Sequence, residues 1–264
     1  MKLVVMLVAL FLLVGAARAD DLYEGRTVVT GMMAENRPPA FAACLRDVLV
    51  KVSGDPRLLD DPAALALGGH AGDLVADYEY VDRMSGIQIH DEQGSRDRSF
   101  VLTMTFDKTK IVTALHTLGR APWTGPRPRV AVILRVRNGE RTYVLASDGA
   151  QGRDQRESLD AVSWQSGVPV AIPKGDTLRA AGVGFESTPS QETLDALAAA
   201  AGGDVALAGS LIWNPGTLGW ASDWQLRWKG ATHRWQIRDV NFDDAFRSGL
   251  RGSAQILSGQ GTPK

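Results

Sequence analysis

The first part of the chain combines a strand pattern with a helix pattern. Residues 22–30 are rich in β-branched side chains and predict a short strand. Between residues 39 and 52, apolar side chains recur three and four positions apart, which is the spacing of one helix face. This stripe consists of Phe41, Cys44, Leu45, Val48, Leu49 and Val52. Gly54 and Pro56 follow directly and predict that the helix ends there.

Immediately after this stripe, the stretch Ser53-Gly54-Asp55 places a hydroxyl close to a carboxylate, as an active site could. Helix capping offers a structural interpretation, because glycine readily takes the left-handed conformation in which many helices end. Asp61 before Pro62 is likewise a favourable start for a second, weaker helix. Capping is therefore the preferred interpretation, and acid–base chemistry by carboxylates such as Asp55, Asp60 and Asp61 is the alternative.

Further along, residues 77–90 and 98–107 alternate in polarity and predict a pair of strands joined by a polar loop. Asp107 can cap the helix that follows, and Gly119 can end it. Residues 120–129 then contain three prolines and a glycine. Such a segment is typical of a junction between domains.

The second half reads as alternating strands and helices. Residues 130–136 are apolar on both faces, as expected for a central strand. The further predicted elements are a strand at 141–146, a helix at 154–166, a strand at 168–173, a helix at 191–201 capped by Ser190, strands at about 205–213, 219–228 and 232–238, and a last helix within 241–257. This order predicts an α/β (α+β) protein with helices packed against mixed or antiparallel sheets.

From these patterns we expect two domains, each with a small sheet and its helices. The N-terminal domain would comprise residues 20–121 and the C-terminal domain residues 129–264, with residues 122–128 as the linker. The C-terminal domain would contain strands rich in tryptophan.

The first 19 residues have the pattern of a signal peptide. Lys2 precedes an apolar run from Leu3 to Val14, and Ala17-Arg18-Ala19 resembles a cleavage site. The run is shorter than the roughly 20 residues that span a bilayer. We therefore expect cleavage after Ala19, export to the periplasm, and no stable membrane anchor afterwards.

Composition and charge exclude some functions. The chain has 29 basic and 30 acidic residues, a formal net charge of −1, so no basic surface for nucleic acid is expected. Its only cysteine, Cys44, lies within the helical stripe and is expected to be a buried apolar group.

Sequence motifs for catalysis, metal binding or cofactor binding are absent. The nucleophile elbow, the phosphate-binding loop and the H-E-x-x-H zinc motif do not occur. Two carboxylate pairs, Asp60-Asp61 and Asp243-Asp244, precede predicted helices, where negative charge is favourable. No histidine lies at a metal-ligand spacing; the four are His70, His90, His116 and His233. We therefore predict no catalytic residue, metal or cofactor.

Tryptophans provide the candidate binding surface. Strand alternation places Trp220, Trp224 and Trp228 on one face. Trp235 joins that face if the hairpin loop has two or four residues, whereas a three-residue loop reverses it. The face is interpreted as core for the last helix to cover. Its alternative is an exposed platform for glycan or peptide, with these four residues as weak binding candidates.

Several segments together resemble a family of exported proteobacterial proteins, the "domain of unknown function 2066". They are "LYEGRTVV" at 22–29, "LRDVLVKVSGD" at 45–55, "DYEYV" at 77–81, Phe106-Asp107, Leu118-Gly119, Trp123 and "RPRVAVIL" at 127–134. The resemblance implies an envelope protein and no assigned activity. A polar insertion around residues 148–157 departs from the family pattern.

The expected function is therefore that of a soluble periplasmic accessory or scaffold protein that binds an envelope protein partner. Two other classes are open. One is a binding protein for cell-wall glycan, such as a peptidoglycan fragment, or for a small molecule. The other is a hydrolase that uses carboxylates.

Overall fold

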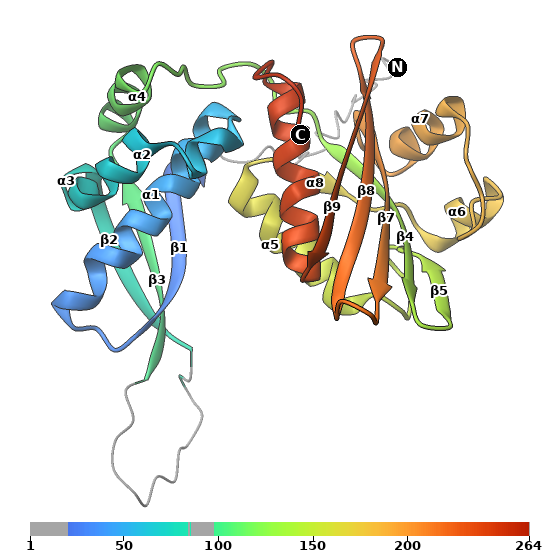
Figure 1. Ribbon diagram of the computed structural model, residues 1–264, viewed down its shortest axis with the longest axis horizontal. Coiled ribbons are helices and arrows are strands. Elements are labelled where there is room, and N and C mark those ends of the chain that lie inside the picture. The colour runs from blue at the N-terminus through green and yellow to red at the C-terminus, as the bar shows by residue number, and fades with distance from the viewer. Residues whose placement is uncertain (1–20, 84, 86–97, 264) are drawn as a thin grey trace, which may run out of the picture.

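The protein is described here from a computed structural model, which covers residues 21–83, 85 and 98–263 (Figure 1). The predicted signal peptide, His90 and most of the predicted loop at 91–98 lie outside the described residues. Figure 1 shows two lobes, which we call the N-terminal lobe (residues 21–119) and the C-terminal lobe (residues 129–263). The α/β fold class is confirmed, because both lobes combine sheets with helices.

The N-terminal lobe has an antiparallel sheet with the order β1-β3-β2. Its strands are β1 (Glu24–Thr30), β2 (Val75–Asp82) and β3 (Ser99–Phe106), and its α-helices are α1 (Arg37–Ser53), α2 (Pro62–Leu67), α3 (Ala71–Leu74) and α4 (Lys108–Thr117). The apolar stripe of α1 packs on one face of the sheet. Cys44 lies in this core, as predicted, and its burial raises the pKa of the thiol to about 12.

Local capping determines where these helices begin and end. Gly54 ends α1 with a φ of +74°, in the left-handed region. The carboxylate of Asp61 accepts hydrogen bonds from the N–H groups of Ala63 and Ala64 at the start of α2. Asp107 caps α4 in the same way. The capping interpretation of the sequence is thus confirmed.

The C-terminal lobe contains a mixed sheet with the order β5-β4-β7-β8-β9 and a short β6 beside β4. β4 pairs in parallel with β6 and β7, and the other pairs are antiparallel. Its strands are β4 (Val130–Asn138), β5 (Arg141–Val144), β6 (Val170–Ala171), β7 (Val205–Asn214), β8 (Gly219–Trp228) and β9 (Ala231–Val240).

Helices pack on both faces of this sheet. One face carries α5 (Arg153–Ser166) and α8 (Phe242–Leu257). The other carries α6 (Gly175–Ala180) and α7 (Gln191–Ala200), which cover β4 and part of β7. Among the described residues, no helix is long and apolar enough to cross a membrane.

Two local predictions differ from the structure. The segment at 168–173 forms only the two-residue β6, because Pro169 and Pro173 flank it and proline cannot donate to a sheet. The short helix α6 was not predicted, since six residues give too few turns for a visible period.

Candidate functional site

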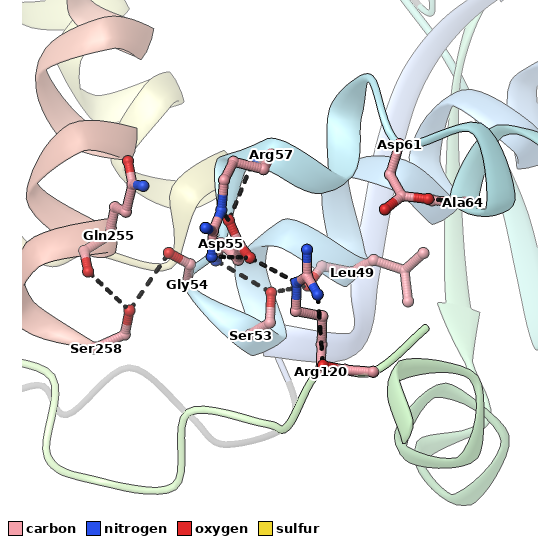
Figure 2. Close-up of polar contacts among 11 residues, drawn as sticks. Leu49, Ser53, Gly54, Asp55, Arg57, Asp61, Ala64, Arg120, Gln255 and Ser258 are labelled. Atoms are coloured by element: carbon pink, nitrogen blue, oxygen red, sulfur yellow. Dashed lines mark hydrogen bonds and ion pairs between the residues drawn. The ribbon is translucent and has the colours of Figure 1, made fainter. Parts of the chain in front are cut away.

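Asp55 lies completely buried directly after α1 (Figure 2). Its Oδ1 accepts hydrogen bonds from the backbone N–H of Arg57 at 3.1 Å and from Nε of Arg57 at 2.7 Å. Its Oδ2 accepts from Nη2 of Arg57 at 2.8 Å and from Nε of Arg120 at 2.7 Å. Arg120 comes from the segment after α4, so the carboxylate joins the end of α1 to the segment that leaves the N-terminal lobe.

These contacts fix the charge of Asp55. Burial alone would raise the pKa of its carboxyl, but the hydrogen bonds from Arg57 and Arg120 outweigh burial and hold the pKa below its usual range. A carboxylate whose pKa is lowered and whose two oxygens are both engaged is unsuited to general acid–base catalysis near neutral pH. The neighbouring Ser53 hydroxyl donates to the carbonyl of Leu49 at 2.7 Å and accepts from the N–H of Asp55. The structure therefore makes this stretch a structural clamp.

The other predicted carboxylates have separate positions. Asp61 caps α2, as described, and Asp60 ends the short 3₁₀ helix Pro56–Leu59. In the second pair, Asp243 accepts a hydrogen bond from Ser158 on α5, and Asp244 binds Arg247 at 2.6 Å in the first turns of α8. Only the contact of Asp243 joins two helices, and the other three carboxylates act within or at the end of a single helix.

Close to this clamp, the C-terminal ends of three helices meet: α1, α5 and α8. The guanidinium of Arg127 donates to the carbonyl of Lys51 at 2.8 Å, in the last turn of α1. It also donates to the carbonyl of Gly167, directly after α5, at 3.0 Å. Ser258, after α8, donates to the carbonyl of Gly54 at 3.4 Å (Figure 2). Since helix C-termini carry partial negative charge, a cation at this point is favourable.

Arg127 is itself largely enclosed. Its guanidinium lies 4.2 Å from the ring centre of Trp123, and burial lowers its pKa to about 10. The group is still charged at neutral pH. Arg127 thus holds main-chain atoms of both lobes together from within the predicted linker.

A second contact between the lobes is built on Trp164 of α5. The ammonium group of Lys51, a residue only 2% exposed, lies 3.8 Å from the centre of the Trp164 ring and 3.2 Å from the carbonyl of Glu24. The guanidinium of Arg26 lies 4.6 Å from the same ring. Two cations of the N-terminal lobe therefore contact one aromatic ring of the C-terminal lobe.

The sequence reasoning missed Lys51, Arg120, Arg127 and Trp164. Lys51 did leave a signal, because it lies between Val50 and Val52 in the last turn of an apolar helix. The arginines lay in a segment treated only as a linker.

The tryptophan candidates lie mainly inside the C-terminal lobe. The loop between β8 and β9 has two residues, so Trp224 pairs with Trp235 and both face α8. Trp224 is 2% exposed and fills the space left by two glycines: a Cβ on Gly209 or Gly249 would come within 2.4 or 2.8 Å of its ring. Trp220 and Trp235 are also buried, and Trp228 is half-buried. The face is therefore packed as core.

An exposed apolar row does exist on the N-terminal sheet. Val28 of β1 and Val81 of β2 both pair with Val101 of β3, so the three form one row across the sheet. This valine row lies on the face opposite α1, and Val28 and Val81 are 53% and 52% exposed. Beside it, Met33 and Val28 line a groove of about 560 Å³ between the free edge of β1 and the start of α1.

Among the described residues, no group of three histidine, cysteine, aspartate or glutamate side chains could hold a metal ion. His90 lies outside that part of the chain.

These observations define a two-lobed α/β protein in which the buried cluster around Asp55 is structural. Residues 16–124 match the family described as a domain of unknown function (DUF8605). The match spans the N-terminal lobe and ends before the C-terminal lobe begins. A comparison with curated proteins found no match.

The family match corrects one prediction from the sequence. The N-terminal part is similar to DUF8605 and not to the domain of unknown function 2066, and nothing in the match indicates a proteobacterial origin. The resemblance noted from the sequence and the family match agree only in pointing to a domain of unknown function. The segments quoted for the resemblance are mostly a strand, a helix end and turns, which unrelated families can share because the same capping physics produces them.

Proposed function

We propose that the protein is an exported, non-catalytic accessory protein of the cell envelope, located in the periplasm, that acts by binding another protein. The observation that carries the proposal is the valine row of the N-terminal sheet, whose two outer members are exposed. Apolar residues gathered on an open surface commonly mark a site of interaction.

The edge of the same sheet supports this proposal. β1 is an edge strand, and an edge strand offers unpaired backbone groups to an extended segment of a partner. The groove beside it supplies apolar contacts from Val28 and Met33. A partner that adds a strand at β1 would cover both the groove and one end of the valine row.

Site-specific photo-cross-linking in the source cell tests the binding role. A photoreactive residue at Val28 or Val81 should give one discrete adduct with a partner protein. The matched control is Leu218, an apolar residue of the β7–β8 turn that is 77% exposed and lies in the other lobe. Equal adducts at all three positions, or none at the two valines, would contradict the proposed binding face.

Export is tested separately by cell fractionation and N-terminal sequencing. The proposal requires a periplasmic chain that begins at Asp20. A cytoplasmic chain that retains Lys2 would overturn the proposed location without affecting the binding face.

A further inference from the structure

The C-terminal lobe has a groove on the sheet face that carries α7. It holds about 600 Å³ and lies where α7 stops covering the strands. The wall beside α7 is apolar and contains Ile133, Val183 and Leu194. The floor on β8 and β9 is polar and contains Gln225, Arg234 and Gln236 among other residues. A volume of this size is typical of small-molecule sites.

The strand register explains this division. Ile133 pairs with Ala208, Ala208 with Gln225, and Gln225 with Arg234, so one row crosses from β4 to β9. Three strand spacings of about 4.8 Å separate its apolar end from its basic end by about 14 Å. The small side chain of Ala208 leaves the middle of the row open.

Each acceptor side chain in the floor already accepts at least one hydrogen bond. The side-chain oxygen of Gln225 accepts from Nε of Arg234 at 3.0 Å. The side-chain oxygen of Gln236 accepts from Arg238 at 2.6 Å. The two carboxylate oxygens of Asp223 accept from Ser210 at 3.3 Å and from Arg238 at 3.2 Å.

Several donors in the floor, in contrast, have no acceptor among the described residues. The Nη1 and Nη2 groups of Arg234 have no acceptor among the residues that the structure describes, and neither do the side-chain NH₂ groups of Gln225 and Gln236. Gln225 also holds the guanidinium of Arg234 in place through its Nε. At the other end of the groove, Arg135 is occupied in part, since it donates to the carbonyl of Ser187 at 3.1 Å.

We propose that this groove binds an apolar carboxylate. The hydrocarbon part of the ligand lies against Ile133, Val183 and Leu194, and its carboxylate accepts hydrogen bonds from Arg234 and the neighbouring amide groups. A guanidinium with two open N–H groups fits a carboxylate in a forked pair. The negative charge of Asp223 is offset because Arg238 binds it directly. This site is in a different lobe from the valine row and does not depend on the proposed function.

Two sources could supply such a ligand, a fatty acid or the C-terminus of an apolar peptide. The probes are decanoate and the peptide N-acetyl-Ala-Leu-Leu, each compared with its carboxamide by titration calorimetry on the purified protein. We expect saturable binding of at least one acid, and binding of its amide weaker by about tenfold or more, as loss of a charge-assisted pair implies.

Three variants locate the binding. Arg234→Gln should weaken binding of the acid by about tenfold or more, and Thr188→Trp should abolish binding by filling the groove from an exposed position in its wall. Arg141→Gln is the matched control, because Arg141 is an exposed arginine of β5, at the opposite edge of the sheet from Arg234, and does not line the groove. Its binding should stay within about twofold of the unaltered protein, as expected for a distant surface charge.

Binding of decanoate alone would identify a fatty acid as the ligand, and binding of the peptide acid alone would identify a chain terminus. The proposal is overturned if neither acid binds saturably at millimolar concentration, or if acid and amide bind equally. It is also overturned if Arg234→Gln leaves the affinity of the acid unchanged. Because Arg234 is exposed, its replacement is not expected to affect folding.

Discussion

Replacing Asp55 by asparagine removes one buried negative charge and changes almost no volume. The amide oxygen can keep the two hydrogen bonds now made to Oδ1. The amide nitrogen, in contrast, would face Nη2 of Arg57 and Nε of Arg120, which now donate to Oδ2. Two charge-assisted hydrogen bonds are therefore lost, and the donor groups of Arg57 and Arg120 are left facing the amide NH₂, which is itself a donor.

The magnitude follows from these two bonds. Hydrogen bonds to charged groups contribute about 1.5–3 kcal/mol each, and breaking a buried ion pair costs about 3–5 kcal/mol. The side chains of Arg57 and Arg120 are 56% and 27% exposed, so water can take up part of what they lose. We expect Asp55→Asn to lower the free energy of unfolding by about 3 kcal/mol at pH 7.

The loss of stability caused by Asp55→Asn should depend on pH. Because the pKa of Asp55 is lower in the folded than in the unfolded protein, its charge stabilises the fold above the unfolded pKa of about 4. This stabilisation is lost as the pH falls through the folded pKa. The difference between the two proteins should therefore be full at pH 7 and pH 5 and shrink below about pH 4.

Urea unfolding followed by tryptophan fluorescence at pH 7, 5 and 3.5 measures this difference. Asp61→Asn is the matched control, because asparagine caps a helix as well as aspartate does and the change should cost less than about 0.5 kcal/mol. A loss under about 1 kcal/mol at pH 7 for Asp55→Asn, or a loss independent of pH, would refute the clamp.

Three further predictions concern the cores and the junction. Gly54→Ala should lower the free energy of unfolding, measured by urea denaturation, by about 2 kcal/mol or more. The reason is that the φ of Gly54 is +74° and a Cβ there would come within 2.6 Å of Ser258. An unchanged urea midpoint would contradict this prediction. Ser222→Ala should leave thermal stability unchanged or raise it by about 1 kcal/mol, because its buried hydroxyl has no partner among the described residues; a clear loss would indicate a partner such as a buried water. Cys44 should react with a thiol reagent at pH 8 only after the protein unfolds. The residue is 2% exposed, and the pKa of its thiol is raised to about 12. Rapid labelling of the folded protein would instead show that helix α1 opens.

Sequence reasoning succeeded where the deciding interaction is local. Gly54, Asp61 and Asp107 act within one turn of their own helices, so their neighbours in the chain suffice to predict them. The placement of Trp235 beside Trp224 required only strand alternation and a two-residue loop. That loop, Lys229-Gly230, has positive φ at both positions, as tight hairpins require.

Sequence reasoning failed where the environment of a side chain depends on residues distant in the chain. Lys51 can be buried because Trp164, more than a hundred positions later, supplies the ring above its ammonium group. Asp55 is held by Arg120 across 65 positions. Nothing in the local pattern around Gln225 or Arg234 indicates that their row ends at an apolar wall, since that depends on the order of four strands.

The contacts of Arg127 limit which sequence changes this protein can tolerate during evolution. Its acceptors are main-chain carbonyls of α1 and of the residue after α5, which every amino acid provides. A substitution at Gly167 would still disturb these contacts, because its φ is +62° and a Cβ there would come within 3.1 Å of the Arg127 guanidinium. Insertions and deletions act differently, because one extra residue rotates the end of a helix by about 100°. The carbonyl would then turn away from the guanidinium. The contacts of Arg127 thus constrain the lengths of these helices, and at position 167 they also favour glycine.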